Sequence, residues 1–247
     1  MLKNFYRENC LEVGVDEVGR GCLSGPVVAG AVVWDPIVIQ EKGFILRDSK
    51  KISERKRYIM KDFIEENAID YCVASIDNIR IDAVNILKAS HEAMHTAIRG
   101  LRVEPELILV DGDRFPHYMS STDNYIEHLC IPGGDDLYCS IAAASILAKC
   151  ERDTYINELC DTDPELDTKY NWRKNKGYGT KAHMDGIKEY GITEWHRKSF
   201  APCKIYFRLV FLLVLFFFFD FLFFFLDLFF LVFFLLVLHE HFPPFFS

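Results

Sequence analysis

The chain lacks the cysteine spacings that mark zinc sites and disulfide frameworks. Its eight cysteines include no Cys-x-x-Cys pair, and several lie inside apolar stretches, where a free thiol packs as a small hydrophobic group. The first ten residues carry three charges and no apolar run, so they do not resemble a secretory signal. Both absences favour a reducing environment, and we expect a cytoplasmic protein.

Phenylalanine is scarce in most of the chain. Of 22 phenylalanines, five precede residue 205 and 17 fall in the last 43 positions, which divides the chain near Lys204. Residues 1–204 are long enough to bury a core, and we predict one domain there, with a helical part at about 160–204. Residues 205–247 form a separate Phe/Leu-rich tail.

The tail lacks the small residues that most membrane-spanning helices use for packing. Between Phe207 and Leu238 there is no Gly, Ala, Ser, Thr or Trp. The segment is long enough to span a bilayer, but T-rich DNA read past the true end of a gene would encode the same composition. Three interpretations stay open: a spurious extension, a carboxyl-terminal membrane anchor and a partner-binding helix. The tail is expected as a helix or a disordered appendage.

Positive charge is in the minority overall but is concentrated near the end of the domain. The net charge is −8, yet residues 169–204 hold nine Lys or Arg against three acids. Aromatic residues are interleaved with these cations, namely Tyr170, Trp172, Tyr178, Tyr190, Trp195 and Phe200. A solvated helical surface explains the charges but not the rings, so the pattern favours binding to a sugar-phosphate backbone.

Residue patterns predict a mixed sheet flanked by helices. Residues 13–18 and 27–35 are rich in β-branched residues and should pair as a hairpin. Further strands are expected at 44–47, 71–76, 107–111 and 128–131, and the strand at 71–76 is expected to be buried. Strands in hairpin order followed by strands separated by helices give an α/β architecture.

Apolar spacing predicts three helices. The first covers 53–67 with Ile59 on its apolar face, the second covers 81–100, and the third begins at Ser140. His91 lies on the apolar face of the second helix, where we interpret it as a packed histidine rather than a ligand.

Two adjacent acids precede a glycine-rich turn near the amino terminus. Asp16 and Glu17 end an apolar strand and are followed by Gly19, Arg20 and Gly21. Because successive side chains of a strand point to opposite faces, at least one acid is expected in a site. The glycines permit close approach of a ligand, and a guanidinium suits phosphate.

Two further acids are placed to join this pair. Asp111 ends a predicted central strand, and Asp135 lies in the loop before the long helix. Four carboxylates in one pocket repel one another unless cations separate them. Oxygen ligands suit Mg²⁺ or Mn²⁺, and two such ions about 4 Å apart stabilise both oxygens of a displacement at phosphorus.

The sequence resembles the type 2 ribonuclease H (ribonuclease HII) family in six ordered blocks over nearly all of residues 10–204. The blocks are GVDEVGRGCLSGPVVAGAVV (14–33), DSKKISERKR (48–57), LVDGDRFP (109–116), GGDDLYCSIAAASILAKCERD (133–153), NKGYGTKAHMDGIKEYG (175–191) and HRKSFAPCK (196–204). The resemblance implies a ribonuclease H-like fold, a mixed β-sheet flanked by helices with a helical carboxyl-terminal part.

The same resemblance implies an activity. The protein would be an endoribonuclease that hydrolyses the RNA strand of RNA/DNA hybrids and nicks at ribonucleotides embedded in duplex DNA. Catalysis would use two divalent ions, Mg²⁺ or Mn²⁺, and would leave a 3′-hydroxyl and a 5′-phosphate. The implied partners are these nucleic acids, with no obligate protein partner, a monomeric state, and membrane contact only if the tail is genuine.

The family pattern also implies roles for individual residues. The catalytic residues and metal ligands are Asp16, Glu17, Asp111 and Asp135. Backbone groups of Gly19, Arg20 and Gly21 read the ribose 2′-hydroxyl, and Tyr178 stacks on the sugar at the RNA-to-DNA junction. Phosphate contacts are expected from Lys50, Lys51, Ser140, Arg197 and Ser199.

Two acids near the expected ligands keep alternative roles. Asp136 competes with Asp135 for the fourth ligand position, and we choose Asp135 because it stands five residues before Ser140, the spacing that the family resemblance implies. Asp113 stands where the family commonly has Asn, and it either points to solvent or alters metal affinity.

Two residues of the carboxyl-terminal half are expected to have structural rather than catalytic or metal-binding roles. Asp153 is interpreted as a structural partner of Arg152 or of a nearby backbone group. His196 is interpreted as orienting the chain rather than as a general acid.

Two other functions are weighed against the nuclease. One is a membrane-tethered, non-catalytic nucleic-acid-binding protein of the same fold, which the four intact acids disfavour. The other is a phosphohydrolase acting on small molecules, which the basic and aromatic surface disfavours because a small ester does not require it.

Overall fold

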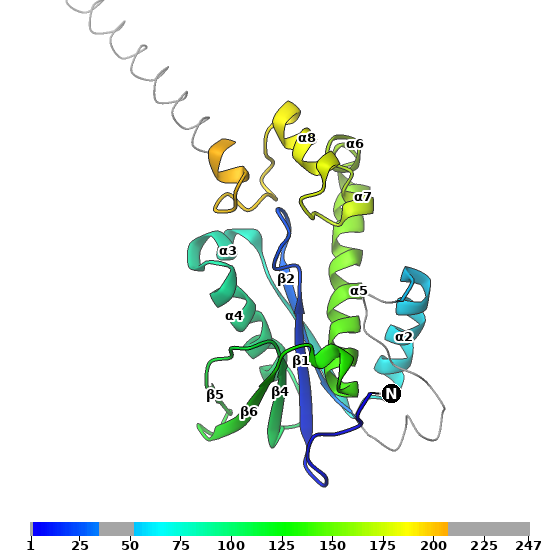
Figure 1. Cartoon of the computed structure of the whole chain (residues 1–247), viewed down its shortest axis with the longest axis vertical. Coiled ribbons are helices and arrows are strands. Elements are labelled where there is room, and N and C mark those ends of the chain that lie inside the picture. Colours follow the sequence, from blue (N-terminus) through cyan, green and yellow to red (C-terminus); the bar gives the residue numbers. More distant parts are fainter. Residues whose placement is uncertain (1, 35–51, 207–247) are drawn as a thin grey trace, which may run out of the picture.

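The computed structural model describes residues 2–34 and 52–206. The expected strand at 44–47, the expected contacts Lys50 and Lys51, and the tail from residue 207 onward lie outside the described residues. A six-stranded sheet with the order β3-β2-β1-β4-β6-β5 forms the centre of the molecule, as Figure 1 shows.

Three antiparallel strands form one half of the sheet. β1 (Glu12–Val18) and β2 (Val27–Val33) are the predicted hairpin, and β2 pairs in turn with β3 (Asp70–Ile76). The sequence suggested a buried strand for β3. It is only partly buried because it lies at the end of the strand order.

The other half of the sheet is mainly parallel. β4 (Leu107–Asp111) runs parallel to β1, and β6 (Tyr125–Ile131) runs parallel to β4. The short β5 (Tyr118–Met119) pairs antiparallel with β6. Because parallel strands end at the same edge of a sheet, the carboxyl ends of β1 and β4 meet.

Helix α5 (Cys139–Thr162) covers one face of the sheet at very short range. A Cβ added to Gly14 would lie 2.2 Å from the Ser140 backbone, and one added to Gly30 would lie 2.4 Å from the Ala144 carbonyl oxygen. Only glycine at these two positions permits this approach, which brings α5 directly against β1 and β2.

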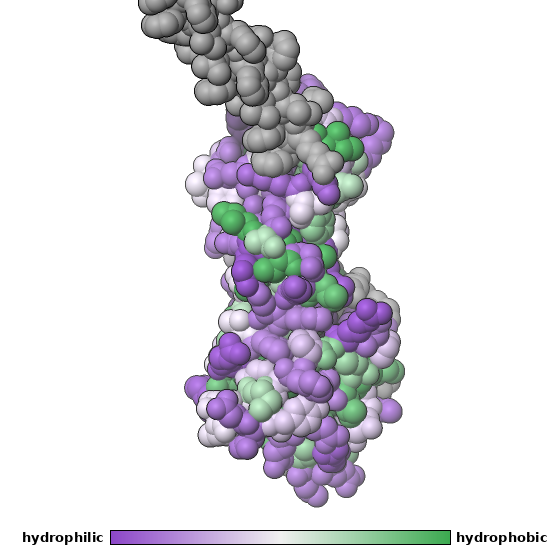
Figure 2. Space-filling view, turned by 90° about the vertical axis from the view of Figure 1, so that its left-hand side faces the viewer, coloured by the Kyte–Doolittle hydropathy of each residue, from purple (hydrophilic) through white to green (hydrophobic). Residues whose placement is uncertain are grey.

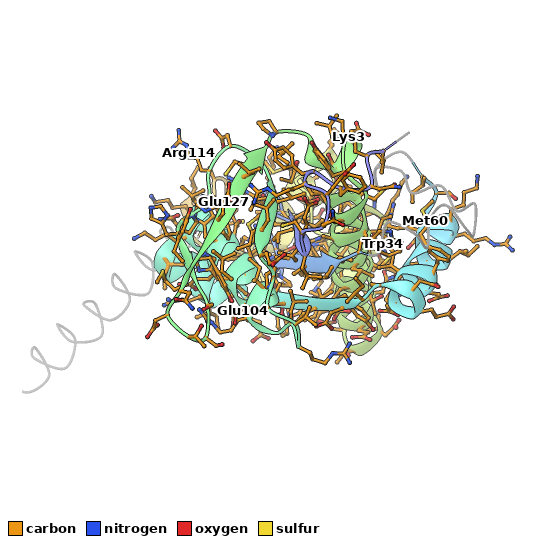
Figure 3. The ribbon with its side chains drawn as sticks, turned by 90° about the horizontal axis from the view of Figure 1, so that it is seen from below. Lys3, Trp34, Met60, Glu104, Arg114 and Glu127 are labelled. Carbon is orange, nitrogen blue, oxygen red and sulfur yellow. The ribbon has the colours of Figure 1, made fainter. Side chains whose placement is uncertain are left out.

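Helix α2 (Glu54–Asn67) packs against α5 and β2. Trp34 and Met60 belong to the apolar cluster between them, and Figure 3 shows these two side chains on the same side of the molecule. Ile59, expected on the apolar face of α2, is instead 52% exposed. Arg57 is buried there because its guanidinium bonds to Asp153 of α5.

The opposite face is covered by two helices where the sequence predicted one. α3 (Asn78–Val84) and α4 (Ile86–Arg99) are separated by Asn85, whose φ is 75°. The Asn85 side chain accepts hydrogen bonds from the N–H groups of Leu87 and Lys88 and thereby caps α4. Figure 2 shows this side of the molecule, largely hydrophilic, with hydrophobic residues gathered at mid-height.

The carboxyl-terminal helices form a separate cluster at the far end of α5. α6 (Glu165–Tyr170), α7 (Trp172–Asn175) and α8 (Lys181–Tyr190) pack around the buried Trp172. Leu23, from the loop between β1 and β2, inserts into the same cluster, so this loop is anchored to the helical part. Within the two described ranges, no helix has the length and apolarity to cross a membrane.

Candidate active site

Two carboxylates meet where β1 and β4 end. The pairing of β1 with β4 runs to Val15 and Val110, so Asp16 and Asp111 are the next residues on adjacent strands. Leu109 packs with Ile141 of α5, and side chains alternate along a strand, so Asp111 lies on the α5 face. Asp16 shares this face with Gly14 and is almost completely buried at 3% exposure.

The other two expected acids complete the surroundings. Glu17 points to the opposite face of β1, past the last pair that β1 forms with β4. Asp135 lies in the 3-10 turn η2 (Gly134–Asp136), just before α5. The Gly134 N–H donates to Asp111 Oδ1 at 2.7 Å, which holds this turn at the end of β4. Asp135 is buried and Asp136 is exposed, an arrangement that favours Asp135 as the inward-facing acid.

The acids of the pocket also affect one another electrostatically. Burial raises the pKa of Asp16 well above its usual value, and the negative charges of Glu17, Asp111 and Asp135 raise it further. Burial also raises the pKa of Glu17, although its hydrogen bond and ion pair with Arg20 oppose the rise. A cation in this pocket would relieve both effects.

The donor chemistry of the pocket fits a hard divalent ion. All four side chains offer carboxylate oxygens, the ligands that Mg²⁺ and Mn²⁺ prefer. In residues 2–34 and 52–206, however, no three His, Cys, Asp or Glu side chains already stand at metal-holding distances. The four acids therefore lie in one region, but their side chains do not yet stand at the distances at which they would bind a single ion.

The turn after β1 has one constrained glycine and one open glycine. Gly19 has φ of +96°, and a Cβ there would lie 2.3 Å from Arg152 Nε. Gly21 has free space where a Cβ would stand. The exposed Arg20 bonds to Glu17 Oε1 at 3.0 Å. The turn thus packs against Arg152 at Gly19 and has open space beside it at Gly21.

Tyr178 lies beside this turn. Its backbone forms a bridge with Cys22, and its ring is 39% exposed. Lys149 Nζ lies 5.9 Å from the ring centroid, and burial raises the pKa of the phenol to about 12. The phenol therefore stays protonated at neutral pH, with part of the ring accessible to a ligand.

The residues expected to contact phosphate differ in their exposure to solvent. Ser199 is exposed and donates its hydroxyl to Asp82 Oδ1 at 2.5 Å. Ser140 is buried against Gly14, and Arg197 has no exposed surface at all. A direct phosphate contact by Arg197 does not agree with this burial, because its donors bond to backbone carbonyls.

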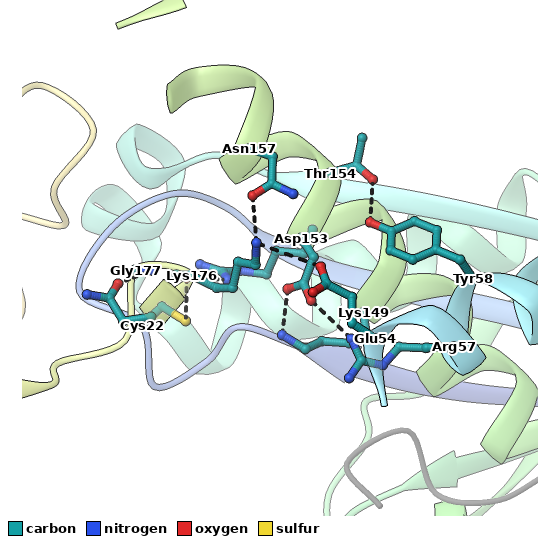
Figure 4. A network of polar contacts seen from close by, with 12 residues as sticks. Cys22, Glu54, Arg57, Tyr58, Lys149, Asp153, Thr154, Asn157, Lys176 and Gly177 are labelled. Carbon is teal, nitrogen blue, oxygen red and sulfur yellow. Dashed lines mark hydrogen bonds and ion pairs between the residues drawn. The ribbon is translucent and has the colours of Figure 1, made fainter. Parts of the chain in front are cut away.

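Asp153 has a structural role, as expected, but its partners are two other side chains. Figure 4 shows its carboxylate between Arg57 Nη1, at 3.1 Å, and Lys149 Nζ, at 2.5 Å. Arg152 was one of the two expected partners, yet neighbouring residues of a helix do not face one another. Asp113 takes the solvent-facing alternative, since its side chain is 79% exposed and pairs with Arg114.

Sequence reasoning missed a buried histidine pair in the helical part. Thr193 N–H donates to His196 Nδ1, so the His196 proton is assigned to Nε2, which lies 3.1 Å from His183 Nε2. His183 Nε2 also accepts a hydrogen bond from Trp172 Nε1–H at 3.1 Å. His183 then donates from Nδ1 to the Tyr178 carbonyl at 3.0 Å. This chain supports the orienting role of His196. Spacing offered no signal for it, because the two histidines meet only through tertiary packing.

A mixed sheet with acids at the ends of adjacent parallel strands, flanked by helices, defines a ribonuclease H-like nuclease. The family model described as Ribonuclease HII matches residues 13–203. Curated ribonuclease HII proteins of Christiangramia forsetii and Cytophaga hutchinsonii are 47% and 44% identical over 81% of this chain, covering 94% and 93% of their own lengths. The chain belongs to the ribonuclease HII family.

Solved structures show the same fold. The ribonuclease H2 of Pyrococcus horikoshii OT3 matches with a TM-score of 0.63 and 25% identity over 79% of this chain and 96% of its own. The ribonuclease HII in a PCNA complex from Archaeoglobus fulgidus matches with a TM-score of 0.61 and 24% identity over 77% of this chain and 95% of its own.

These findings establish the class of activity. The chain is an endoribonuclease of ribonuclease H type 2, a family that acts on RNA/DNA hybrids. Neither the membrane-tethered alternative nor the small-molecule phosphohydrolase receives support from the similar proteins.

Proposed function

We propose that the chain nicks duplex DNA at embedded ribonucleotides and cleaves the RNA strand of hybrids, leaving a 3′-hydroxyl and a 5′-phosphate. Asp16, Glu17, Asp111 and Asp135 are the catalytic residues and hold two divalent ions, Mg²⁺ or Mn²⁺. The observation that carries this proposal is geometric: Asp16 and Asp111 end adjacent parallel strands, and the Gly134 N–H of the η2 turn that carries Asp135 bonds to Asp111 Oδ1. A solved ribonuclease HIII of similar fold binds Mn²⁺.

Bound divalent ions supply activation of water and stabilisation of charge at phosphorus. The protein's own contribution is position. The buried end of β1 fixes Asp16, the hydrogen bond from Gly134 fixes Asp111, and η2 brings Asp135 to the same edge. Rigid elements of this kind keep the reacting groups aligned.

Recognition of the ribose is assigned to the surface beside the acids. Gly19, Arg20 and Gly21 present backbone groups to the 2′-hydroxyl, and the open space at Gly21 leaves room for a sugar. The half-exposed Tyr178 ring offers a stacking face. Lys50, Lys51, Ser140 and Ser199 are proposed to assist phosphate binding, and the buried Ser140 does so only through its position at the start of α5.

The domain boundary and the assembly state stay proposals. We place the catalytic unit at residues 1–204 and expect a chain that works without an obligate protein partner, in the cytoplasm. The PCNA complex of the Archaeoglobus fulgidus protein is a property of that protein. A chain truncated after Lys204 should cut as fast as the full chain, and a large loss would assign the tail a role.

The deciding experiment uses the full chain and a duplex that contains one ribonucleotide. In Mg²⁺ or Mn²⁺ the strand that contains the ribonucleotide should be nicked, leaving a 3′-hydroxyl on one product and a 5′-phosphate on the other. Nicking should stop in EDTA. A sequencing gel maps the product ends. The all-DNA duplex of identical sequence is the control and should stay intact. Equal cutting of both duplexes would reject ribonucleotide recognition.

A further inference from the structure

Two guanidinium groups are buried beneath the turn that follows β1. Arg152 of α5 and Arg197 of the carboxyl-terminal segment both have no exposed surface and are among the largest fully buried side chains. Burying a cation costs several kcal/mol unless its donors are satisfied. Their partners therefore indicate what the protein gains by placing them there.

Within the described residues, the hydrogen-bond partners of Arg152 are backbone carbonyls from two loops. Its Nε and Nη2 donate to the carbonyls of Pro26 and Ser24, each at 3.0 Å. Its Nη1 donates to the carbonyl of Lys176 at 2.7 Å. One guanidinium thus joins the loop after β1 to the loop that carries Tyr178, two residues beyond Lys176.

Arg197 binds the same loop at three other points. Its Nη1 donates to the Arg20 carbonyl, its Nε to the Gly25 carbonyl and its Nη2 to the Pro26 carbonyl, all at 3.0 Å. The Arg20 carbonyl belongs to the peptide that links Arg20 with Gly21. Its direction fixes the direction of the Gly21 N–H, since the two groups share one planar peptide.

Arg152 also packs directly against Gly19 and lies near the Tyr178 ring. The backbone at Gly19 lies on Arg152 so closely that a Cβ would stand 2.3 Å from Nε. The Arg152 guanidinium carbon lies 5.8 Å from the Tyr178 ring centroid. No ion pair joins either guanidinium to a carboxylate in the described ranges, so both charges act on the loop above them.

We propose that Arg152 and Arg197 are positioning residues that set the preference for a ribonucleotide by fixing the Arg20–Gly21 peptide and the Tyr178 loop. This inference rests on the proposed function and deepens it. Neither residue touches the nucleic acid, and Arg197 acts through the carbonyl it holds rather than on a phosphate. The planar fork of guanidinium is needed, because a lysine ammonium is a single flexible point of charge that cannot reach three diverging carbonyls.

The test compares binding of two duplexes in EDTA, where metal-dependent cutting is absent. One duplex contains a single ribonucleotide and the other is its all-DNA counterpart, and fluorescence anisotropy gives both dissociation constants. Arg197→Lys and Arg152→Lys should each weaken binding of the ribonucleotide duplex about tenfold, the effect of one or two lost hydrogen bonds, and leave the all-DNA duplex nearly unchanged. Arg102→Lys, which alters a guanidinium paired with Asp70 far from this loop, is the matched control and should keep the wild-type ratio.

The outcomes separate this inference from the proposed function. A wild-type chain that neither prefers the ribonucleotide duplex nor nicks it rejects the proposed function. A wild-type chain that does both, with Lys variants that melt cooperatively and keep the wild-type ratio of dissociation constants, overturns the positioning role. A parallel loss on both duplexes also overturns it, because a merely structural role predicts that pattern. Where a Lys variant has no melting transition, Arg197→Gln, which keeps an NH₂ donor without charge, replaces it.

Discussion

The Gly134 N–H donates a 2.7 Å hydrogen bond to Asp111 Oδ1 and so ties the turn carrying Asp135 to the carboxyl end of β4. The two acids lie 24 residues apart in the sequence, yet one backbone donor sets their relative placement. The same bond anchors the Asp111 carboxylate to the turn. It explains how a short 3-10 turn can belong to a rigid site.

Asp16→Asn should abolish cutting and stabilise the fold. The substitution removes a proposed metal ligand, and bound metal ions stabilise the charge of the transition state by several kcal/mol. The nicking rate should therefore fall by about a thousandfold or more. In EDTA at pH 7 the melting temperature should rise, because the substitution removes a buried acid whose ionised form is disfavoured by burial and by three neighbouring acids. Calorimetry and a gel-based nicking assay measure the two effects. Undiminished cutting would show that Asp16 is not a ligand.

The two glycines of the turn should respond differently to alanine. Gly19→Ala combines a φ of +96° with a clash against Arg152, so it should lower the free energy of unfolding by about 1–3 kcal/mol. Gly21→Ala meets open space and should change it by less than about 0.5 kcal/mol. Urea titrations test both values.

Gly21→Ala should nevertheless weaken binding of the ribonucleotide duplex, because a methyl group would stand where the sugar is expected to approach. Anisotropy in EDTA provides the measurement. Normal binding by a folded Gly21→Ala protein would place the ribose elsewhere.

His196 should make the protein less stable as the pH falls. Burial, with the charge of His183, lowers the pKa of His196 in the folded state to about 3, against about 6.5 in the unfolded chain. Above pH 6.5 the residue is neutral in both states and contributes no pH dependence. Below it only the unfolded chain takes up the proton, so stability should fall by about 2 kcal/mol between pH 7 and pH 5 from this residue.

The test of this pH effect is a difference between variants. His196→Gln should lose that share of the pH dependence, whereas His117→Gln, at an exposed histidine, should keep the wild-type profile. Urea titrations at pH 7, 6 and 5 give the three profiles. Identical slopes for the wild type and His196→Gln would mean that His196 titrates normally.

Asn85 should be more sensitive to alanine than to glycine. Asn85→Ala loses the cap of α4 and keeps a Cβ at a φ of 75° without the side-chain hydrogen bonds that stabilise Asn85 there, for a cost of about 2 kcal/mol. Asn85→Gly loses the same cap but tolerates the backbone angle, so its cost should stay near half that value. Thermal melts of the two variants rank them, and the reverse order would argue against the strained junction.

Local patterns in the sequence determined much of the architecture. Alternation of β-branched residues predicted the β1–β2 hairpin, and a short apolar run predicted β4 with Asp111 at its end, because both signals depend on neighbours in the chain. The family resemblance predicted the four acids and identified the ribonuclease H type 2 class. Spacing also favoured Asp135 over Asp136, and the structure shows Asp135 buried.

Tertiary structure alone decided the partners of the buried charges. Arg197 carries a guanidinium that could bind phosphate. Because the side chain is buried beneath the loop after β1, its donors bond instead to the carbonyls of residues 20, 25 and 26. Asp153 pairs with Arg57 across two helices instead of with its neighbour Arg152, and the break at Asn85 interrupts an apolar periodicity that continues on both sides. Hydrophobic periodicity reports which face of an element is buried. It carries no information on which distant backbone or side chain a buried charge will meet, since that depends on how the elements pack.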